Sequence, residues 1–584
     1  MSSRTPIEEF SLDTLQDALP AISQQNNTST SVLVSNTITN AAARSDFDQT
    51  TIRANLGDKD AQVALGDMYK DGKGVLQDHK AAMEWYLRAA EQGDPVGQRK
   101  VGVLYDHGYG VVQDYSTAMV WYIKSADQGN SQAQSNIGHF YRYGHGVPLD
   151  YSKAMEWFLM AAGQGNADAQ NHIGNLYHGG LGVPQDYSLA YDWYLKAAEQ
   201  NEPYAQTNIG HNYRYGEGVT ADYSEAMRWY VKAADQDHAD AHVAIGLLYY
   251  DGKGVIQDYS KALEWFMKAA EQGNAAAQHN IGFCYMYLYG LGVARDYSLA
   301  LTWSLKAAAQ GDARAQLVVG NIYRLGSGVT KDFSKAMEFY LLCAGQGNAD
   351  AQNHIGNFYF DGCGVPQDYS QALDWYNKAA AQGNQHAQYN LGGMYRDGQG
   401  VTQNFTKAME WFIKAAEQGD ADSQANVGFL YRDGKGVVRD YSEARRWFLK
   451  AAKQGEACSQ HNLGCLHHNG QGGVRDYVQA MTWIRKAADQ DFMLAQYHVG
   501  HMYQHGHGVD ADYSQASEWL LKAAKQGYDE AQYDVGRLYE YGDGVPQDIS
   551  AAKEWYLKAA KQGYMEAQTR LTYIHRQGSY FFGL

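Results

Sequence analysis

The sequence predicts an all-α solenoid of about fourteen helix–loop–helix repeats, each 36 residues long. The first supporting observation is a glycine in strings of the type (Leu/Ile/Val)-Gly-x-x-Tyr, which recurs every 36 residues except for one step of 38. These glycines are Gly66, Gly102, Gly138, Gly174, Gly210, Gly246, Gly282, Gly320, Gly356, Gly392, Gly428, Gly464, Gly500 and Gly536. The second observation is that the 13 tryptophans share one position of the repeat, nineteen residues after the glycine. Trp303 stands twenty-one residues after its glycine, because the repeat with the step of 38 contains two extra residues before it. Such a period indicates stacked helical units.

The first helix of each unit, helix A, is predicted from apolar residues at helical spacing, as at Ala169, Ile173 and Tyr177. Its glycine lets a neighbouring helix approach closely because it has no Cβ. A Gly-x-Gly-Val loop follows, as at residues 144–147, and its glycines supply the positive φ angles that end a helix.

The second helix, helix B, is predicted to begin after an Asp that stands before it in every unit except one, where Asn404 takes its place. Asp suits this N-cap position because its carboxylate accepts free backbone N–H groups at the positive end of the helix. Ala154, Trp157 and Ala161 share one face of helix B, so the tryptophans are interpreted as packing residues. One helix pair cannot bury its own apolar face, and neighbouring units must stack.

Composition and charge narrow the function classes. The 65 acidic and 48 basic residues give a net charge of −17 spread along the chain, which disfavours nucleic acid and anionic lipid as partners. Five scattered cysteines are too few for a disulfide framework, and no apolar run is long enough to cross a bilayer. The first residues show no secretory pattern, so a cytoplasmic location is expected. No catalytic constellation or phosphate loop stands out from the repeat, and we expect no enzymatic activity and no cofactor.

Four segments are expected along the chain. Residues 1–45 are rich in Ser, Thr, Asn and Gln and are predicted to be disordered. Residues 46–58 look like a degenerate helix B that caps the solenoid, residues 59–568 form the fourteen repeats, and residues 569–584 form a C-terminal cap with an apolar tail. Terminal units need such atypical ends because one face of each has no neighbouring repeat.

The repeat resembles the Sel-1-like repeat family, relatives of the tetratricopeptide repeat with a longer inter-helix loop. The resemblance rests on the string A-x-x-x-(I/L)-G-x-x-Y-x-x-G-x-G-V-x-x-D-Y-x-x-A-x-x-W-x-x-K-A-A-x-Q-G-(N/D)-x-x-A-Q, which runs from about Asp60 to Gln568. It implies a right-handed superhelix that acts as an adaptor for other proteins, with no catalysis of its own. Two features of some members are missing, namely a cysteine pair in each repeat and a signal sequence with a membrane anchor.

Three positions of each helix A share a face and are not needed for packing: two residues before the glycine, one after it and four after it. We call these positions, taken along the chain, the polar ladder. The resemblance to tetratricopeptide repeats implies that helix A lines the concave side, which makes the ladder the candidate binding surface. Its candidate residues are Asn136, His139, Arg142, His172, Asn175, His178, Asn208, His211, Arg214, Arg324, His354, Asn357, Arg396, Arg432, His498 and His501.

The chemistry of the ladder favours a protein segment that is acidic or phosphorylated. Asn amides bond an extended peptide backbone, and Arg guanidinium groups bind carboxylate or phosphate bidentately. Histidines such as His139, His172 and His211 would add positive charge below about pH 6.5. The alternative is that these side chains are solvated or link one repeat to the next.

One helix A carries residues of the types that bind zinc. His461, Cys465 and His468 lie at i, i+4 and i+7 on one face, and His501 stands level with Cys465 one repeat on. Zinc binds such ligands, but these positions hold polar residues in other repeats too, so we expect no metal there.

These features favour a non-enzymatic adaptor or scaffold for protein partners, in signalling or protein quality control. One rival is a regulatory subunit or activator of an enzyme, such as a ubiquitin-ligase complex in ER-associated degradation or a membrane synthase. The other is a metal-binding protein centred on the twelfth and thirteenth repeats. The sequence leaves the oligomeric state open.

Overall fold

The computed structural model of the chain describes residues 46–287 and 294–581, without the side chains of residues 287 and 576–581. The segment predicted to be disordered, 1–45, and the end of the apolar tail, 582–584, lie outside the described residues. Within the described ranges every regular element is a helix. The prediction of an all-α solenoid of about fourteen helix–loop–helix repeats is confirmed.

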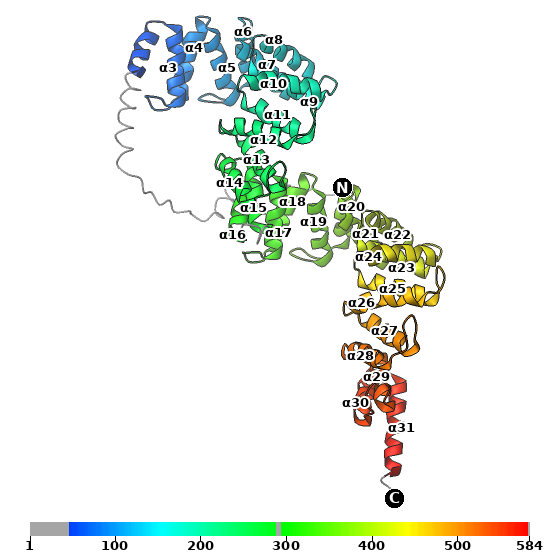
Figure 1. The fold of residues 1–584 in the computed structure, drawn as a ribbon. Coiled ribbons are helices and arrows are strands. Elements are labelled where there is room, and N and C mark those ends of the chain that lie inside the picture. Colours follow the sequence, from blue (N-terminus) through cyan, green and yellow to red (C-terminus); the bar gives the residue numbers. More distant parts are fainter. Residues whose placement is uncertain (1–45, 288–293, 582–584) are drawn as a thin grey trace. The chain divides into compact units, whose positions relative to one another are not determined.

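The two predicted kinds of helix alternate along the chain (Figure 1). The A helices are α3 (Lys59–Asp71), α5 (Pro95–His107), α7 (Ser131–Tyr143), α9 (Ala167–Gly179), α11 (Pro203–Tyr215), α13 (Ala239–Asp251), α15 (Ala275–Tyr287), α17 (Ala313–Leu325), α19 (Ala349–Asp361), α21 (Gln385–Asp397), α23 (Ala421–Asp433), α25 (Ala457–Asn469), α27 (Met493–His505), α29 (Asp529–Tyr541) and α31 (Met565–Phe581). The B helices are α4 (His79–Glu91), α6 (Tyr115–Ala126), α8 (Tyr151–Gly163), α10 (Tyr187–Glu199), α12 (Tyr223–Ala234), α14 (Tyr259–Glu271), α16 (Tyr297–Ala309), α18 (Phe333–Gly345), α20 (Tyr369–Ala381), α22 (Phe405–Glu417), α24 (Tyr441–Lys453), α26 (Tyr477–Ala488), α28 (Tyr513–Lys525) and α30 (Ile549–Lys561).

The described residues form two compact units, divided between residues 318 and 319, and in each unit helices that follow one another in sequence pack together. In the first unit, a helix at residues 46–55 places Ala54 in a buried cluster with Ala61 and Leu65 of α3. In the second, Ile574 of α31 packs in a cluster with Tyr556 of α30. The expected border between residues 568 and 569 falls inside α31, so the last helix A and the segment after it are one element.

The helix ends follow the predicted pattern. The carboxylate of Asp150 accepts a hydrogen bond of 3.0 Å from the backbone N–H of Lys153 at the start of α8, and Asn404 caps α22 in the same way. Gly144 ends α7 with a φ of 73°, and Gly146 follows with a φ of 66°. Side chains with a Cβ rarely adopt such angles, which explains the glycines of the loop.

The most deeply buried aromatic side chain of a repeat is the neighbour of the tryptophan. The residue directly after the tryptophan position is Tyr or Phe in most units and is fully buried, as at Tyr230 and Phe266. A Cβ on Gly210 would lie 2.3 Å from Cε1 of Tyr230, so this glycine makes room for the ring. Trp265 is only partly buried: it packs against the edge of the core, and Lys268 Nζ lies 3.8 Å from its ring centroid. The tryptophans therefore pack, but the principal core aromatic is the residue that follows them.

Adjacent repeats are also joined by buried glutamines, which the sequence analysis did not single out. Gln424 Nε2 donates to the carbonyl oxygen of Ala416 at the end of the preceding helix B, at 3.0 Å, and its Oε1 accepts from Gln454 Nε2 at 2.9 Å. Gln98 in the other unit accepts in the same way from Gln128, at 2.8 Å. We call this arrangement the glutamine bridge. It adds a second hydrogen bond to a carbonyl group at the end of helix B, which otherwise accepts from a backbone N–H just beyond the helix.

Candidate functional site

The structure places all sixteen candidate residues of the polar ladder on A helices, and all sixteen are partly exposed. They are Asn136, His139 and Arg142 on α7; His172, Asn175 and His178 on α9; Asn208, His211 and Arg214 on α11; Arg324 on α17; His354 and Asn357 on α19; Arg396 on α21; Arg432 on α23; and His498 and His501 on α27. The ladder is thus a half-buried polar face, with its side chains held between repeats.

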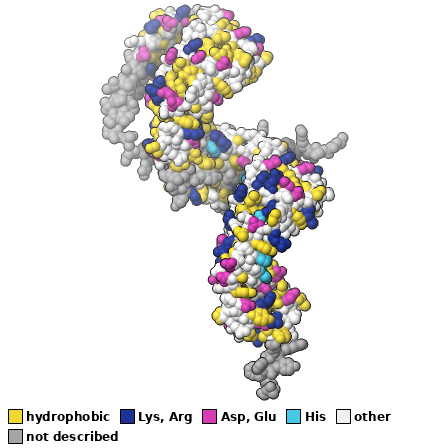
Figure 2. Space-filling view, turned by 45° about the vertical axis from the view of Figure 1, so that its right-hand side comes forward, with side chains coloured by type: hydrophobic (Ala, Val, Ile, Leu, Met, Phe, Trp, Pro, Cys, Tyr) yellow, Lys and Arg dark blue, Asp and Glu magenta, His cyan; other side chains and the backbone are white. Residues whose placement is uncertain are grey.

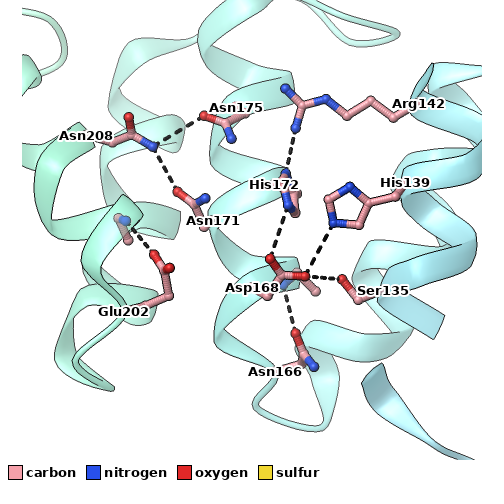
Figure 3. A network of polar contacts seen from close by, with 12 residues as sticks. Ser135, His139, Arg142, Asn166, Asp168, Asn171, His172, Asn175, Glu202 and Asn208 are labelled. Carbon is pink, nitrogen blue, oxygen red and sulfur yellow. Dashed lines mark hydrogen bonds and ion pairs between the residues drawn. The ribbon is translucent and has the colours of Figure 1, made fainter. Parts of the chain in front are cut away.

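A carboxylate that the sequence analysis missed organises the ladder between α7 and α9 (Figure 3). Asp168 accepts from Ser135 Oγ at 2.6 Å, and it lies 3.5 Å from His139 Nε2 and 3.2 Å from His172 Nε2. Arg142 Nη1 donates to the other ring nitrogen of His172, Nδ1, at 2.6 Å. Burial opposes the ionisation of Asp168, but hydrogen bonds from His139, His172 and Ser135 outweigh it and hold its pKa well below the usual range. The signal in the sequence is an acid four residues before a histidine, on the same helix face.

Three asparagines form a second recurring contact, which we call the amide node. Asn208 Nδ2 of α11 donates to Asn171 Oδ1 of α9 at 2.9 Å and to Asn175 Oδ1 at 3.4 Å (Figure 3). The same three positions in the second unit hold Asn353, Asn357 and Asn390, and both distances there are 3.1 Å. The node joins positions three before and one after the glycine of one repeat to the position two before the glycine of the next. Ladder amides at these nodes therefore link repeats, as the alternative interpretation expected.

Several ladder arginines are already occupied by neighbouring carboxylates. Arg396 donates through Nε and Nη2 to both oxygens of Asp397, at 2.8 and 2.7 Å, and Arg432 is paired likewise with the residue that follows it. Arg214 lies 3.3 Å from Asp251, and its side chain is only 9% exposed. These three guanidinium groups are held by the protein itself and offer little to an external anion.

Arg142 and Arg324 differ from them. Among the described residues, no carboxylate lies within ion-pair distance of either guanidinium group. Arg324 Nε donates to Tyr340 OH at 3.1 Å, and its Nη2 lies 3.5 Å from Asn321 Oδ1. A positive charge whose contacts are neutral remains available to an acidic ligand.

The pKa values of three ladder histidines lie below the value that the sequence suggests. Burial lowers the pKa of His211, of His354 and of His498 to about 4, so these rings stay neutral at pH 6. The expectation that His211 becomes charged below about pH 6.5 is therefore wrong, because desolvation disfavours its protonated form. His178 and His501 face carboxylates instead: their Nε2 atoms lie 2.9 Å from Glu217 and Asp534.

Exposed tyrosines stand at the same position at the ends of three A helices, α7, α11 and α29, and those of α7 and α11 lie beside candidate ladder residues. Tyr143 at the end of α7 is 52% exposed, and Tyr215 at the end of α11 is 61% exposed. The guanidinium carbon of Arg142 lies 5.2 Å from the ring centroid of Tyr143, and that of Arg214 lies 5.3 Å from Tyr215. These two tyrosines lie five residues after the glycine and outside the core, and the sequence analysis did not single them out.

The stacked 36-residue helix pairs match a known family of repeat proteins. The profile of the Sel1 repeat matches residues 59–94, 95–130, 131–166, 167–202, 203–238, 239–274, 275–312, 313–348, 349–384, 385–420, 421–456, 459–492, 494–528 and 529–564. The chain belongs to the Sel1 repeat family. The crystal structure of c5321, a protective antigen present in uropathogenic Escherichia coli strains and displaying an SLR fold, is 36% identical; the match covers 77% of this chain and 97% of that one, with a TM-score of 0.58. A Sel1 repeat protein from Oxalobacter formigenes is 33% identical, over 53% of this chain and 90% of that one, with a TM-score of 0.43. None of the curated proteins matches the sequence.

A Sel1 repeat solenoid is a typical scaffold for protein–protein interaction, and typically not an enzyme. Figure 2 shows acidic and basic side chains interspersed on the visible face of this Sel1 repeat protein, unlike the basic surface of nucleic-acid-binding proteins. None of the helices among the described residues is long and apolar enough to span a membrane.

Proposed function

We propose that this Sel1 repeat protein is a non-enzymatic scaffold that binds a segment of a partner protein along the polar ladder, with its principal contact at α7–α11. The observation that carries the proposal is the pair of exposed tyrosines, Tyr143 and Tyr215, at the edge of the ladder. Tyrosine offers a large amphipathic surface with few rotatable bonds and is common in binding surfaces. A soluble protein that exposes two such rings beside one polar face has a surface suited to a partner.

The charges of this region favour an acidic or phosphorylated segment. Arg142 keeps its positive charge without a carboxylate partner among the described residues, and it stacks near Tyr143. Its bond to His172 fixes the guanidinium group, so less conformational entropy is lost when a ligand binds. In the second unit, Arg324 likewise has no carboxylate partner among the described residues, and we propose it as a secondary contact.

Crosslinking in the native cell tests the location of the binding face. A photoreactive phenylalanine at position 143 or 215 should give defined crosslinked species. The same group at Leu159 or Met160, which are 46% and 45% exposed on α8, should give none above background. Equal crosslinking from both pairs of positions would contradict a binding face on the ladder.

Titration with fluorescent acidic and phosphoserine peptides tests the chemistry. Arg142→Glu should weaken binding at least tenfold, because one attraction becomes a repulsion, and binding by the unaltered chain should weaken with salt. Lys153→Glu is the matched control: this lysine is exposed on α8, and its Nζ lies 3.8 Å from the capping Asp150 and 5.3 Å from the ring centroid of Tyr141. Equal loss in the two variants would show that only net charge matters.

The hypothesis of a regulatory enzyme subunit stays a prediction, as does the cytoplasmic location. Co-purification with one enzyme in a fixed ratio would favour the regulatory subunit.

A further inference from the structure

Two histidines and a cysteine converge between α25 and α27, on a part of the polar ladder that lies outside the principal contact proposed at α7–α11. His461 Nε2 lies 2.7 Å from His498 Nδ1, and Cys465 Sγ lies 3.5 Å and 3.9 Å from the same two nitrogens. His461 is 7% exposed, while Cys465 and His498 are partly exposed. Three atoms that can each bind a metal therefore converge at one place, and two of the three residues are partly exposed.

These residues occupy the three positions of the amide node. His461 and Cys465 stand three before and one after Gly464, and His498 stands two before Gly500. In the nodes at Asn171 and Asn353 all three places hold asparagine, and the amides bond one another. The fold therefore needs only small polar groups at these places, and here all three are replaced by side chains that ligate transition metals.

The interatomic distances fit a tetrahedral zinc site with little movement. Zinc bound to nitrogen at about 2.05 Å and to sulfur at about 2.3 Å separates two nitrogens by about 3.3 Å, and nitrogen from sulfur by about 3.6 Å. The two N···S distances, 3.5 and 3.9 Å, bracket the latter value. The N···N distance of 2.7 Å would have to open by about 0.6 Å, which a small ring rotation provides.

A second cluster of possible ligands, formed by His139, Asp168 and His172 in the first unit, has hydrogen bonds that oppose metal binding. Arg142 donates to His172 Nδ1, so that nitrogen must present its lone pair and the proton resides on Nε2, the atom that faces Asp168. A metal at Nε2 would require a proton on Nδ1, directed at the arginine. His139 and Asp168 alone make an incomplete ligand set.

We propose that His461, Cys465 and His498 form a zinc site that joins the twelfth and thirteenth repeats, with a fourth position open to water or to an exogenous ligand. The sequence analysis paired His461 and Cys465 with other histidines and expected no metal there. The structure directs those others elsewhere: His468 Nε2 lies 3.1 Å from a nitrogen of His507, and His501 faces Asp534.

The surroundings are compatible with a bound cation. Arg432 is the nearby positive group, and its Nε and Nη2 donate to both oxygens of Asp433, at 2.7 and 3.2 Å.

Zinc content of the full chain tests the proposal. Protein stripped with a chelator, given zinc chloride and dialysed against a weak competing chelator should retain one zinc per chain. The triple variant His461→Asn, Cys465→Asn and His498→Asn recreates an amide node, so it should keep its helical circular dichroism and lose at least nine tenths of the zinc. His172→Asn, at the other cluster, and Cys458→Ser, one helical turn away from His461, are matched controls that should leave the zinc content unchanged.

Cobalt chloride distinguishes the ligands. Cobalt bound to the unaltered chain should show a sulfur-to-metal charge-transfer band and tetrahedral d–d bands. Cys465→Asn should remove the charge-transfer band, and His498→Asn should weaken cobalt binding at least tenfold. Zinc retention equal in the unaltered chain and the triple variant would overturn the site. A charge-transfer band that survives Cys465→Asn but is lost in Cys458→Ser would overturn the assignment of its sulfur ligand.

Discussion

Single residues set how closely the two helices of a repeat approach. Gly210 of α11 faces Tyr230 of α12, and a Cβ there would come within 2.3 Å of the ring. In the seventh repeat the equivalent of the tyrosine is Ser304, whose Oγ is buried and has no hydrogen-bond partner among the described residues. One position of helix B thus decides both the tightness of the pair and the polarity of its core.

Gly210→Ala should lower the free energy of unfolding of its repeat by about 1–3 kcal/mol, because a buried ring that has no free space must move. Gly163→Ala is the control: this helical glycine has nothing within 4 Å of its Cβ direction, and alanine favours a helix. Hydrogen exchange of α11 and α8 measures both. Destabilisation of equal size in the two variants would contradict the close approach at Gly210.

Acid should weaken the repeat that contains His211. The pKa of this ring is about 4 in the folded chain and about 6.5 in the unfolded chain, so between these values the unfolded state binds more protons. The contribution of the neutral His211 ring to the free energy of unfolding is complete above about pH 6.5. It falls by at most about 3 kcal/mol as the pH is lowered towards 4. Stabilities of α11 and α12 from hydrogen exchange at pH 7 and pH 5 should show this loss. In His211→Asn the loss should be smaller, because an amide does not titrate in this pH range. The variant should keep its fold, because Asn accepts from tyrosine at the same position, as Asn175 does from Tyr194 at 2.8 Å.

At the scale of the elements, the glutamine bridge connects most A helices to the helix B before them and to the end of their own helix B; in α13, His242 takes the place of the glutamine. Gln424 makes both bonds while only 5% exposed. A buried amide with both groups satisfied fixes the relative position of two helices, whereas an apolar contact tolerates sliding. The bridge therefore contributes to the regular stacking that aligns the ladder.

Gln424→Leu should destabilise its repeat by about 1–3 kcal/mol, because one N–H of Gln454 loses its partner in a buried place and the carbonyl of Ala416 keeps only its bond from the backbone N–H of Gly419. Faster hydrogen exchange in α22–α24 is the measurement. Gln371→Leu, on the exposed face of α20, is the control and should change stability by no more than about 0.5 kcal/mol. If both variants behaved alike, the bridge would have no specific effect.

The sequence predicts the elements better than their contacts. Spacing alone locates each helix, its Asp cap and its glycine loop, because these depend on residues close together in the chain. It cannot say which side chains of neighbouring repeats meet. Asp168 and His139, or Cys465 and His498, stand about one repeat apart, and only the offset of stacked A helices brings them together. Burial also decides the charge of a side chain. It keeps His211 neutral, whereas the residue type alone suggests a positive charge below about pH 6.5.

At the scale of the whole molecule, each of the two units is an array in which helices that follow one another in sequence pack together. Stability in such an array is close to a sum of repeat terms and nearest-neighbour terms. Damage to one repeat should therefore stay local, unlike damage to the single core of a globular domain.

Phe266→Ala gives this expectation its sharpest test. The ring is 1% exposed in the core formed by α14 and α15, so its loss should cost about 3–5 kcal/mol. Trp265→Ala, one residue earlier, removes a larger but only partly buried ring and should cost less. Hydrogen exchange should accelerate in α13–α15 in both variants, and more in Phe266→Ala, while α23–α29 in the other unit keep their protection. A larger loss in Trp265→Ala would show that the tryptophan is the principal core aromatic. A uniform loss over all helices would show that the array unfolds as one cooperative unit, because only then does a cavity in the sixth repeat reach helices that share no contact with it.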